Sequence, residues 1–265
     1  MPPVVLTIAG FDPSSGAGVT ADLKTMAAHD FYGVACITAL TVQSTQGVRR
    51  VEAVAGELVR ETLDELAKDF EIAAVHIGML GDQDIVQVVG DFLNRQRAAN
   101  VVLDPVLRSS SGKALLEGGA LSLEQLFPLA ALVTPNIDEA SEMTGLPVTN
   151  LEEMRRAAER LHTKGARAVV VTGGHLNPAV DLLSCAGEAG PTQEEFSGPQ
   201  LRSKSTHGTG CAFATAVACQ LAHGKTVREA VFLAKAYVAG AIANAYPVGK
   251  GIGPLNHLYR FGRGQ

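Results

Sequence analysis

The chain has 265 residues, of which 46% are hydrophobic and 18% are charged. This composition is typical of a compact globular protein, and the length allows one large domain or two small ones. Lys and Arg number 22 against 27 Asp and Glu, giving a formal net charge of −5 without a long run of one sign. Such a balance argues against nucleic acid or an anionic membrane surface as the main partner.

The sequence carries no pattern typical of export or membrane insertion. Residues 1–16 lack the basic segment and the apolar run of a secretory signal. No window approaches the ~20 apolar residues that span a bilayer. None of the four cysteines belongs to a CxxC pair: Cys36, Cys185, Cys211 and Cys219. We therefore expect a cytoplasmic protein with reduced thiols.

Short apolar runs alternate with longer helical patterns along the chain. The apolar runs predict strands at residues 4–9, 73–78, 100–106, 131–135, 167–174 and 180–185. The longer patterns predict helices at residues 18–29, 57–70, 83–97, 150–164, 209–223 and 226–245, with a short helix after residue 135. Near-continuous Val, Ile and Leu strands separated by helices indicate an α/β fold, with a mostly parallel sheet covered by helices on both faces. The stretch from 180 to about 205 has a more antiparallel pattern.

One domain over residues 1–265 is the simplest organisation, because the sequence shows no internal repeat and no linker long enough to separate two domains. Segment 33–55 is rich in strand-forming residues and shows no helical pattern. We expect it to form a flap or lid over the edge of the sheet.

Unusual residues gather where the predicted strands end. They are Gly10-Phe11-Asp12, Gln43-Ser44-Thr45, Gly78-Met79-Leu80, Asp104-Pro105, Thr134-Pro135-Asn136 and Gly173-Gly174-His175. In open α/β sheets, ligands bind beyond the carboxyl ends of the strands. The clustering therefore predicts a single site at that edge.

The segment Gly16–Ala21 loosely matches a dinucleotide-binding pattern, but too many residues separate it from the preceding strand. A glycine-rich entry to a helix is the better interpretation. Asp22 follows within the first turns of that helix, where it could favour the helix dipole or hold a substrate hydroxyl. The chain contains no GxxxxGK[ST] motif, which excludes a P-loop NTPase.

The stretch "STHGTGCAFA" (205–214) places two glycines directly before a predicted helix. Backbone N–H groups can converge there on an anion, although a plain glycine-rich turn is the alternative. Cys211 falls in the first turn, where we expect a lowered thiol pKa. It could pack as an apolar group, act as a nucleophile with His207, ligate a metal or accept a proton. A proton acceptor beside an anion site best suits phosphoryl transfer.

Asn136 and Glu139 lie three residues apart at the start of the predicted short helix. They could cap that helix, and they could also reach magnesium-bound water and phosphate oxygens. Asp104 ends a buried strand and is a second candidate for the metal site.

These segments together resemble the ribokinase-like superfamily, and within it the hydroxymethylpyrimidine/phosphomethylpyrimidine kinases of thiamine biosynthesis. The resemblance runs over nearly the whole chain and is most specific in "TIAGFDPSSGAGVTADLKT", "ITALTVQSTQGV" and "STHGTGCAFATAVA". It implies phosphorylation of 4-amino-5-hydroxymethyl-2-methylpyrimidine, and then of its monophosphate, with ATP and Mg²⁺. Relatives are often homodimers, so the resemblance also implies a homodimer.

The resemblance assigns roles to individual residues. It implies that Gln43 reads the aminopyrimidine edge, in a pocket lined by Gly10, Asp22 and Met79. It implies an anion hole made by N–H groups of Gly208, Gly210 and Cys211, with Cys211 as the base. On the nucleotide side it implies Asn136, Glu139, Thr209 and Thr172, with Asp104 and Glu139 holding Mg²⁺ through water.

The chain departs from the family pattern at Thr172, where relatives often carry Lys before Gly-Gly-His. Lys204, Lys235, Lys250 or Arg108 could supply the missing cation. Three alternative functions stay open at this point: a pyridoxal or pyridoxine kinase of the same fold, a cysteine hydrolase using Cys211, and a nonenzymatic protein that senses the pyrimidine.

Overall fold

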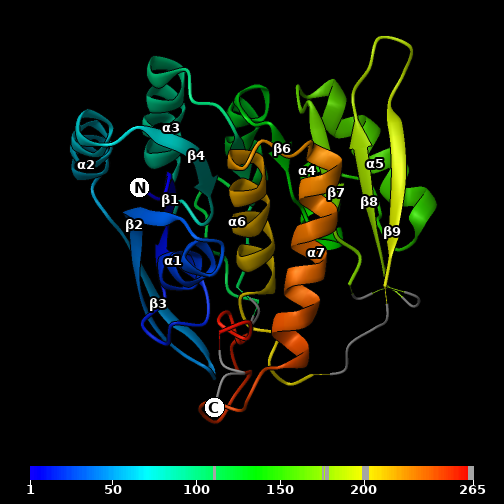
Figure 1. Cartoon of the computed structure of the whole chain (residues 1–265). Helices are drawn as coiled ribbons and strands as arrows, with labels where there is room; N and C mark the ends of the chain where they lie inside the picture. The colour runs from blue at the N-terminus through cyan, green and yellow to red at the C-terminus, as the bar shows by residue number, and fades with distance from the viewer. Residues whose placement is uncertain (110–111, 175, 177–178, 199–202, 262–265) are drawn as a thin grey trace.

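A nine-stranded sheet runs through the molecule and carries helices on both of its faces (Figure 1). This computed structural model describes residues 1–109, 112–174, 176, 179–198 and 203–261. The strands, in chain order, are β1 (Val4–Phe11), β2 (Tyr32–Ser44), β3 (Gly47–Ala53), β4 (Ile72–Ile77), β5 (Val101–Leu103), β6 (Leu132–Val133), β7 (Ala168–Val171), β8 (Val180–Cys185) and β9 (Thr192–Ser197).

The strands lie in the spatial order β3-β2-β1-β4-β5-β6-β7-β8-β9. Neighbours from β2 to β7 pair in parallel, whereas β3, β8 and β9 pair antiparallel at the two ends of the sheet. The predicted fold class, a mostly parallel sheet with an antiparallel end after residue 180, is confirmed.

Both faces of the central strands are buried, which explains their near-continuous apolar sequences. Along β1, Leu6 and Ile8 pack into one hydrophobic core while Val5 packs into the other. Along β7, Val169 and Val170 divide between the same two cores. Successive strand residues point to opposite faces, so a strand covered on both sides needs an apolar residue at every position.

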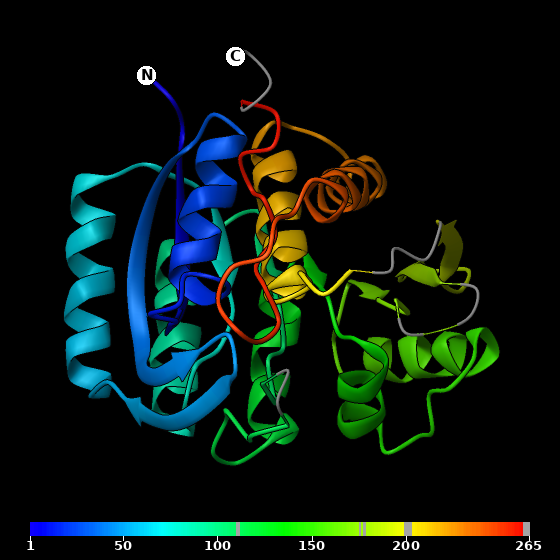
Figure 2. The same cartoon turned by 90° about the horizontal axis from the view of Figure 1, so that it is seen from below.

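The helices are α1 (Gly18–Ala28), α2 (Gly56–Asp69), α3 (Gln83–Gln96), the 3₁₀ helix η1 (Ala120–Leu129), α4 (Ile137–Thr144), α5 (Leu151–Thr163), α6 (Thr209–Ala222) and α7 (Val227–Ala243). α1, α6 and α7 supply the helical part of one core, and the remaining helices supply that of the other. Figure 2 shows the two helical layers on either side of the sheet. No helix in the described part of the chain is both long and apolar enough to cross a membrane.

Three predicted strands, β5, β6 and β7, are shorter than expected, and one helix was not predicted. β5 ends at Leu103 and β6 at Val133, each shortly before a proline, Pro105 or Pro135, which has no N–H for the ladder. The helix η1 contains Pro128 and is of the 3₁₀ type, so its residues do not follow the 3.6-residue period by which helices are recognised.

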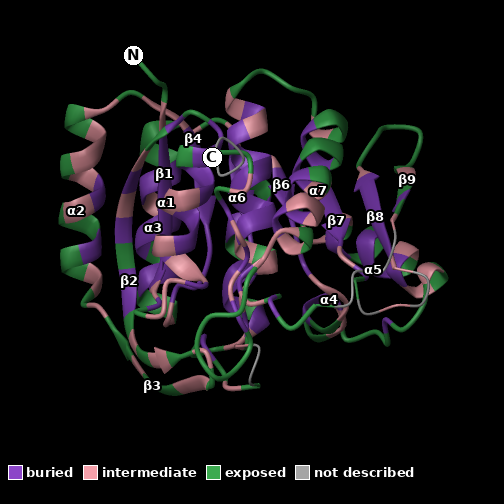
Figure 3. Ribbon diagram, turned by 60° about the horizontal axis from the view of Figure 1, so that its bottom comes forward, coloured by how far each residue is buried: buried purple, intermediate pink, exposed green. Residues whose placement is uncertain are grey.

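Segment 33–55 consists of β2 and β3, which form an antiparallel hairpin at the edge of the sheet. Figure 3 shows intermediate and exposed residues along β3 and the adjoining part of β2. The turn of the hairpin is held by the C-terminal segment, because the N–H of Ile252 donates to the carbonyl of Thr45 at 2.9 Å and Gly251 donates to the Thr45 hydroxyl at 3.1 Å.

Candidate active site

Residues from distant parts of the sequence meet beyond the carboxyl ends of the strands. A Cβ on Gly208 would lie 1.9 Å from the carbonyl oxygen of Gly16, and one on Gly10 would lie 2.9 Å from Sδ of Met79. A Cβ on Gly210 would lie 3.8 Å from Oδ2 of Asp104. The structure therefore brings the β1–α1 loop, the end of β4 and the start of α6 into one site, as the strand-end pattern predicts.

The start of α6 has the geometry of an anion site. Gly208 precedes the helix with φ +80°, and no side chain caps the first turn. Thr209 does not supply such a cap, because its hydroxyl donates to the carbonyl of Thr206 at 2.8 Å. Backbone N–H groups of the first turn, including those of Gly210 and Cys211, have no acceptor within the helix and face outward with the positive end of the helix dipole. An anion can bind there.

Cys211 does not have the lowered pKa that its place in the first helical turn predicts. Burial of the thiol raises its pKa well above the ordinary value, and the Asp104 and Asp22 carboxylates raise it further. A hydrogen bond from the N–H of Gly18 acts in the opposite direction but is outweighed. The prediction of a thiolate-rich cysteine is therefore wrong for the free protein, since the carboxylates and the burial outweigh the helix start.

Two buried carboxyl groups, Asp104 and Glu139, lie on the other side of the site. Burial raises the pKa of Asp104 to about 6. Burial and the charge of Asp104 raise that of Glu139 to about 8. Glu139 and Asn136 form a capping box at the start of α4, in which Oε2 of Glu139 accepts from the N–H of Asn136 at 2.9 Å. The capping interpretation is thus confirmed.

The carboxyl pair fits a divalent cation bound through water. Two neighbouring buried carboxylates without a cation have raised pKa values, and an added cation would favour their charged forms. Among the described residues no group of three or more His, Cys, Asp or Glu side chains is arranged to hold a metal by itself. Mg²⁺ commonly binds with one or two carboxylates, several waters and the phosphates of a nucleotide, so a pair is sufficient.

Asp22 does not line the mouth of the site as expected. It is fully buried, and its two carboxylate oxygens accept from the Thr7 hydroxyl at 2.7 Å and the Thr215 hydroxyl at 2.9 Å. Nδ1 of His76 lies 3.3 Å from Oδ2 of Asp22. The side chain that the sequence places near a substrate hydroxyl is therefore anchored beneath the site, where it acts on Cys211 and Asp104 by its charge.

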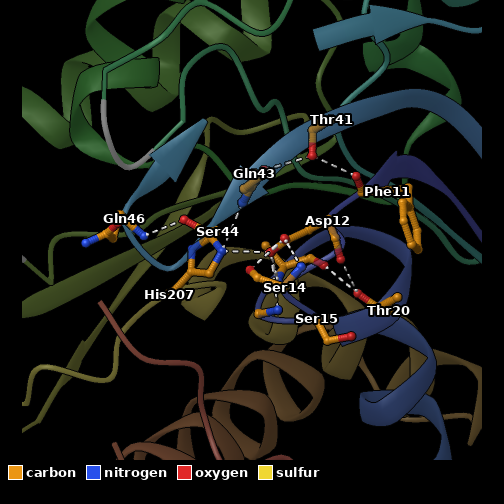
Figure 4. Close-up of polar contacts among 12 residues, drawn as sticks. Phe11, Asp12, Ser14, Ser15, Thr20, Thr41, Gln43, Ser44, Gln46 and His207 are labelled. Carbon is orange, nitrogen blue, oxygen red and sulfur yellow. Dashed lines mark hydrogen bonds and ion pairs between the residues drawn. The ribbon is translucent and has the colours of Figure 1, made fainter. Parts of the chain in front are cut away.

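Gln43, at the end of β2, belongs to a polar network that the sequence analysis does not identify (Figure 4). Its carboxamide lies 3.2 Å from the Thr41 hydroxyl and 3.1 Å from Nε2 of His207. The same His207 nitrogen lies 2.8 Å from Oδ2 of Asp12. Asp12 also accepts from the backbone and hydroxyl of Ser14, so it anchors the loop after β1.

The sequence held a signal for this network. Asp-Pro-Ser-Ser-Gly directly after a strand is typical of an Asx turn, in which the aspartate binds the backbone two residues on. The partners His207 and Gln43 lie 195 and 31 residues away from Asp12 and could not be found from local pattern. Among the described residues, Nε2 of His207 contacts Asp12 and Gln43 and no hydrogen bond joins His207 to Cys211, so the nucleophile–base pair of a cysteine hydrolase is not formed.

The position of Thr172 is beside the capping box. It forms an isolated parallel bridge with Asn136, and its N–H donates to the carbonyl of Pro135 at 2.9 Å. Of the cations suggested as substitutes for the family Lys, Lys235 pairs with Asp181 and Arg108 pairs with Glu142. Lys204 and Lys250 are exposed. His175, which follows Gly173-Gly174, lies outside the described residues.

An open α/β sheet with an uncapped helix start opposite two buried carboxyl groups is the arrangement expected of a phosphotransferase of the ribokinase-like class that the sequence resembles. The family model for phosphomethylpyrimidine kinase matches residues 12–256. A hydroxymethylpyrimidine/phosphomethylpyrimidine kinase of Streptomyces coelicolor is 42% identical over 264 residues, covering 98% of this chain and 96% of that protein. The chain therefore belongs to the phosphomethylpyrimidine kinase family, and the recognition made from its motifs is confirmed.

Two further comparisons extend this result. The thiamine biosynthesis bifunctional protein ThiED of Geobacter sulfurreducens is 44% identical over 258 residues, or 96% of this chain. The chain spans about half of that protein, 52% of its length. A solved structure of the pyridoxal kinase from Staphylococcus aureus, in complex with AMP-PCP and pyridoxal, is 32% identical with a TM-score of 0.88, covering 100% of this chain and 97% of that one.

Proposed function

We propose that this protein phosphorylates 4-amino-5-hydroxymethyl-2-methylpyrimidine to its monophosphate and then to the diphosphate, using ATP, in thiamine biosynthesis. The observation that carries the proposal is the uncapped start of α6 facing Asp104, within a chain of this family. The N–H groups of Gly208, Gly210 and Cys211 hold the transferred phosphoryl group, whose oxygens carry negative charge in the transition state.

The nucleotide lies on the side of α4, near Asn136, Thr172 and Thr209. Asp104 and Glu139 hold Mg²⁺ through water, and the ion supplies positive charge against the phosphate oxygens when it is bound. AMP-PCP, the ligand named for the Staphylococcus aureus pyridoxal kinase, is an ATP analogue, which supports ATP as the donor. Lys204 and Lys250 are the exposed cations available for a further phosphate contact.

Cys211 takes the proton of the hydroxymethyl group in the first transfer. The thiol hydrogen-bonds to Asp104, so Cys211 can receive that proton once its own has passed to the Asp104 carboxylate. The raised thiol pKa makes Cys211 a strong base in the deprotonated form, although the thiolate is scarce before ligands bind. The monophosphate of the second transfer is already anionic near pH 7, with a second pKa of about 6.

The pyrimidine lies between Gly10, Met79 and Gln43. Met79 packs against Gly10, and Gln43 projects from the hairpin of β2 and β3. A carboxamide offers a donor and an acceptor side by side, which suits the amino group and ring nitrogen of an aminopyrimidine. The hairpin acts as a flap over this pocket, tied at Thr45 to the C-terminal segment.

A coupled assay of ATP consumption with the aminopyrimidine alcohol, followed by mass analysis of the product, tests the proposal. Products heavier by one and then two phosphoryl groups are expected. ATP consumption that does not depend on the pyrimidine would contradict it. Pyridoxal is the second candidate substrate, because the Staphylococcus aureus relative is a pyridoxal kinase that superposes over the whole chain. Comparing kcat/KM for the two alcohols ranks them.

A cytoplasmic homodimer completes the proposal. All four cysteines are free, which suits a reducing compartment. Ile37, Leu40 and Val42 on β2 are apolar and exposed near the edge of the sheet, where a second copy can cover them. Light scattering tests the dimer, and Leu40→Glu is expected to shift the mass towards the monomer.

A further inference from the structure

The carboxamide of Gln43 lies between two hydrogen-bonding neighbours that together decide which way round it points. As drawn in Figure 4, the carboxamide oxygen lies 3.2 Å from the Thr41 hydroxyl and the carboxamide nitrogen lies 3.1 Å from Nε2 of His207. The oxygen and the nitrogen of a carboxamide can exchange places by a half-turn, with almost no change in shape. The neighbours therefore select the orientation by their hydrogens.

His207 offers a hydrogen to Gln43 and no lone pair. Its Nε2 lies 2.8 Å from Oδ2 of Asp12, which only accepts when it is ionised. Although burial favours the neutral acid, hydrogen bonds from His207 and Ser14 outweigh it and hold the pKa of Asp12 below its ordinary value. The hydrogen of His207 is therefore on Nε2, and the Nε2 lone pair is unavailable to an amide N–H.

Thr41 completes the assignment from the other side. Its hydroxyl lies 2.9 Å from the carbonyl oxygen of Phe11 and can give its single hydrogen to that acceptor. The hydroxyl oxygen then accepts from Gln43. Both neighbours are satisfied when the carboxamide is rotated by a half-turn from the placement in Figure 4, so that the Gln43 nitrogen faces Thr41 and the Gln43 oxygen shares the hydrogen on Nε2 of His207.

We propose that His207, itself oriented by Asp12, is a positioning residue that fixes the Gln43 carboxamide with its oxygen towards His207 and its nitrogen towards Thr41, and thereby makes the site specific for an aminopyrimidine. The His207 side chain is only 13% exposed and that of Asp12 is 3% exposed, so the pair is held in place by packing. The ring also contacts the loop after β1, since a Cβ on Gly16 would lie 2.2 Å from Cδ2 of His207.

The consequence for substrates rests on the proposed function, in which Gln43 reads the pyrimidine edge. The fixed oxygen accepts from the exocyclic amino group, and the fixed nitrogen donates to the neighbouring ring nitrogen. The 4-oxo analogue, with a carbonyl in place of the amino group and a hydrogen on the adjacent ring nitrogen, presents the reverse pattern. A Gln43 carboxamide that cannot rotate must reject the 4-oxo analogue, whereas a carboxamide that is free to rotate can bind it.

The test compares His207→Met with His207→Gln, two side chains of similar length that differ in their ability to donate to Asp12 and Gln43. Calorimetric Kd values without nucleotide, and kcat/KM with Mg-ATP, are measured for the amino and oxo pyrimidines. The wild-type protein is expected to prefer the amino compound, and in His207→Met the ratio of the values for the amino and oxo compounds is expected to fall at least about tenfold. His207→Gln is expected to restore part of it. A preference unchanged in a folded His207→Met protein, or no rescue by Gln, would overturn the proposal.

Nuclear magnetic resonance of the free protein gives a readout that needs no substrate. The Gln43 side-chain amide hydrogens are expected to show contacts with the Thr41 methyl group, and the His207 ring to carry its hydrogen on Nε2. Amide contacts with the His207 ring instead would refute the orientation. A wild-type protein with the expected contacts that binds neither pyrimidine would support the orientation and refute the proposed substrate alone.

Discussion

Gly210→Ala separates the anion site from the stability of the fold. A Cβ at this position would lie 3.8 and 3.9 Å from the two carboxylate oxygens of Asp104, which is ordinary contact with the protein. The residue is in the first turn of α6 and does not have a positive φ. Replacing a helical glycine with alanine should stabilise the fold by about 0.5–1 kcal/mol, which corresponds to a rise in Tm of roughly 1–4 °C.

Activity should change in the opposite direction. The added methyl group occupies the space between the helix start and Asp104, where the proposed phosphoryl group is held. Loss of one such contact reduces the rate about 10²–10³-fold, or about 2.7–4 kcal/mol of transition-state stabilisation. We therefore expect kcat/KM of both phosphorylations to fall by that factor while Tm rises.

The assay is steady-state kinetics with each pyrimidine, together with thermal unfolding of the same samples. Gly90→Ala is the matched control, because Gly90 lies within α3, in the other helical layer, and its new Cβ would contact the side chains of Leu126 at 3.4 Å and Gln125 at 3.9 Å. The control should keep full activity. If Gly210→Ala gains stability and also keeps full kcat/KM, the phosphoryl group does not pass between α6 and Asp104.

Three further predictions concern the same site. Cys211→Ala should slow the first phosphorylation about 10²–10⁴-fold and the second much less. Cys211→Asp should retain some activity in the first step. Single-turnover rates of both steps test this prediction, and equal losses in the two steps would contradict it. Gly208→Ala should destabilise the protein by more than about 2 kcal/mol in urea unfolding, because φ is +80° and the Cβ would meet Gly16 at 1.9 Å. Glu139, whose pKa is raised from 4.5 to about 8, favours the fold most at low pH, and this contribution is lost as the pH rises towards 8. The Tm of the metal-free wild-type protein should therefore fall more between pH 6 and pH 8 than the Tm of Glu139→Gln. An identical fall in both proteins would show that Glu139 does not titrate in this range.

The sequence was sufficient for the fold and for the meeting of the strand ends with the start of α6. Continuous apolar strands such as β1 and β7 can be buried only between two helical layers, and the carboxyl ends of parallel strands must meet at one edge. Gly10, Met79, Gly210 and Asp104 therefore come together as predicted from their places after strands and before α6.

Electrostatic behaviour was not predictable in the same way. A local rule, that a thiol at a helix start has a lowered pKa, fails for Cys211 because the carboxylates of Asp104 and Asp22 arrive from other elements. Asp22 itself was expected near solvent, but Thr7 and Thr215 enclose it. Such partners depend on packing across the sheet and not on neighbours in sequence.

The buried charges beneath the site point to what the free protein lacks. Asp22, Asp104 and Glu139 are all buried there, and the imidazole of His76 lies against Asp22 with a raised pKa despite its burial. A helix start contributes only about half of an elementary positive charge. A pKa of about 8 shows that this positive charge is not enough to keep Glu139 ionised at neutral pH, and the pKa of Asp104 is also raised, to about 6. A ligand that brings positive charge to the carboxyl pair and negative charge to the start of α6 stabilises both parts of the site at once. A magnesium–nucleotide complex carries its charges in that arrangement.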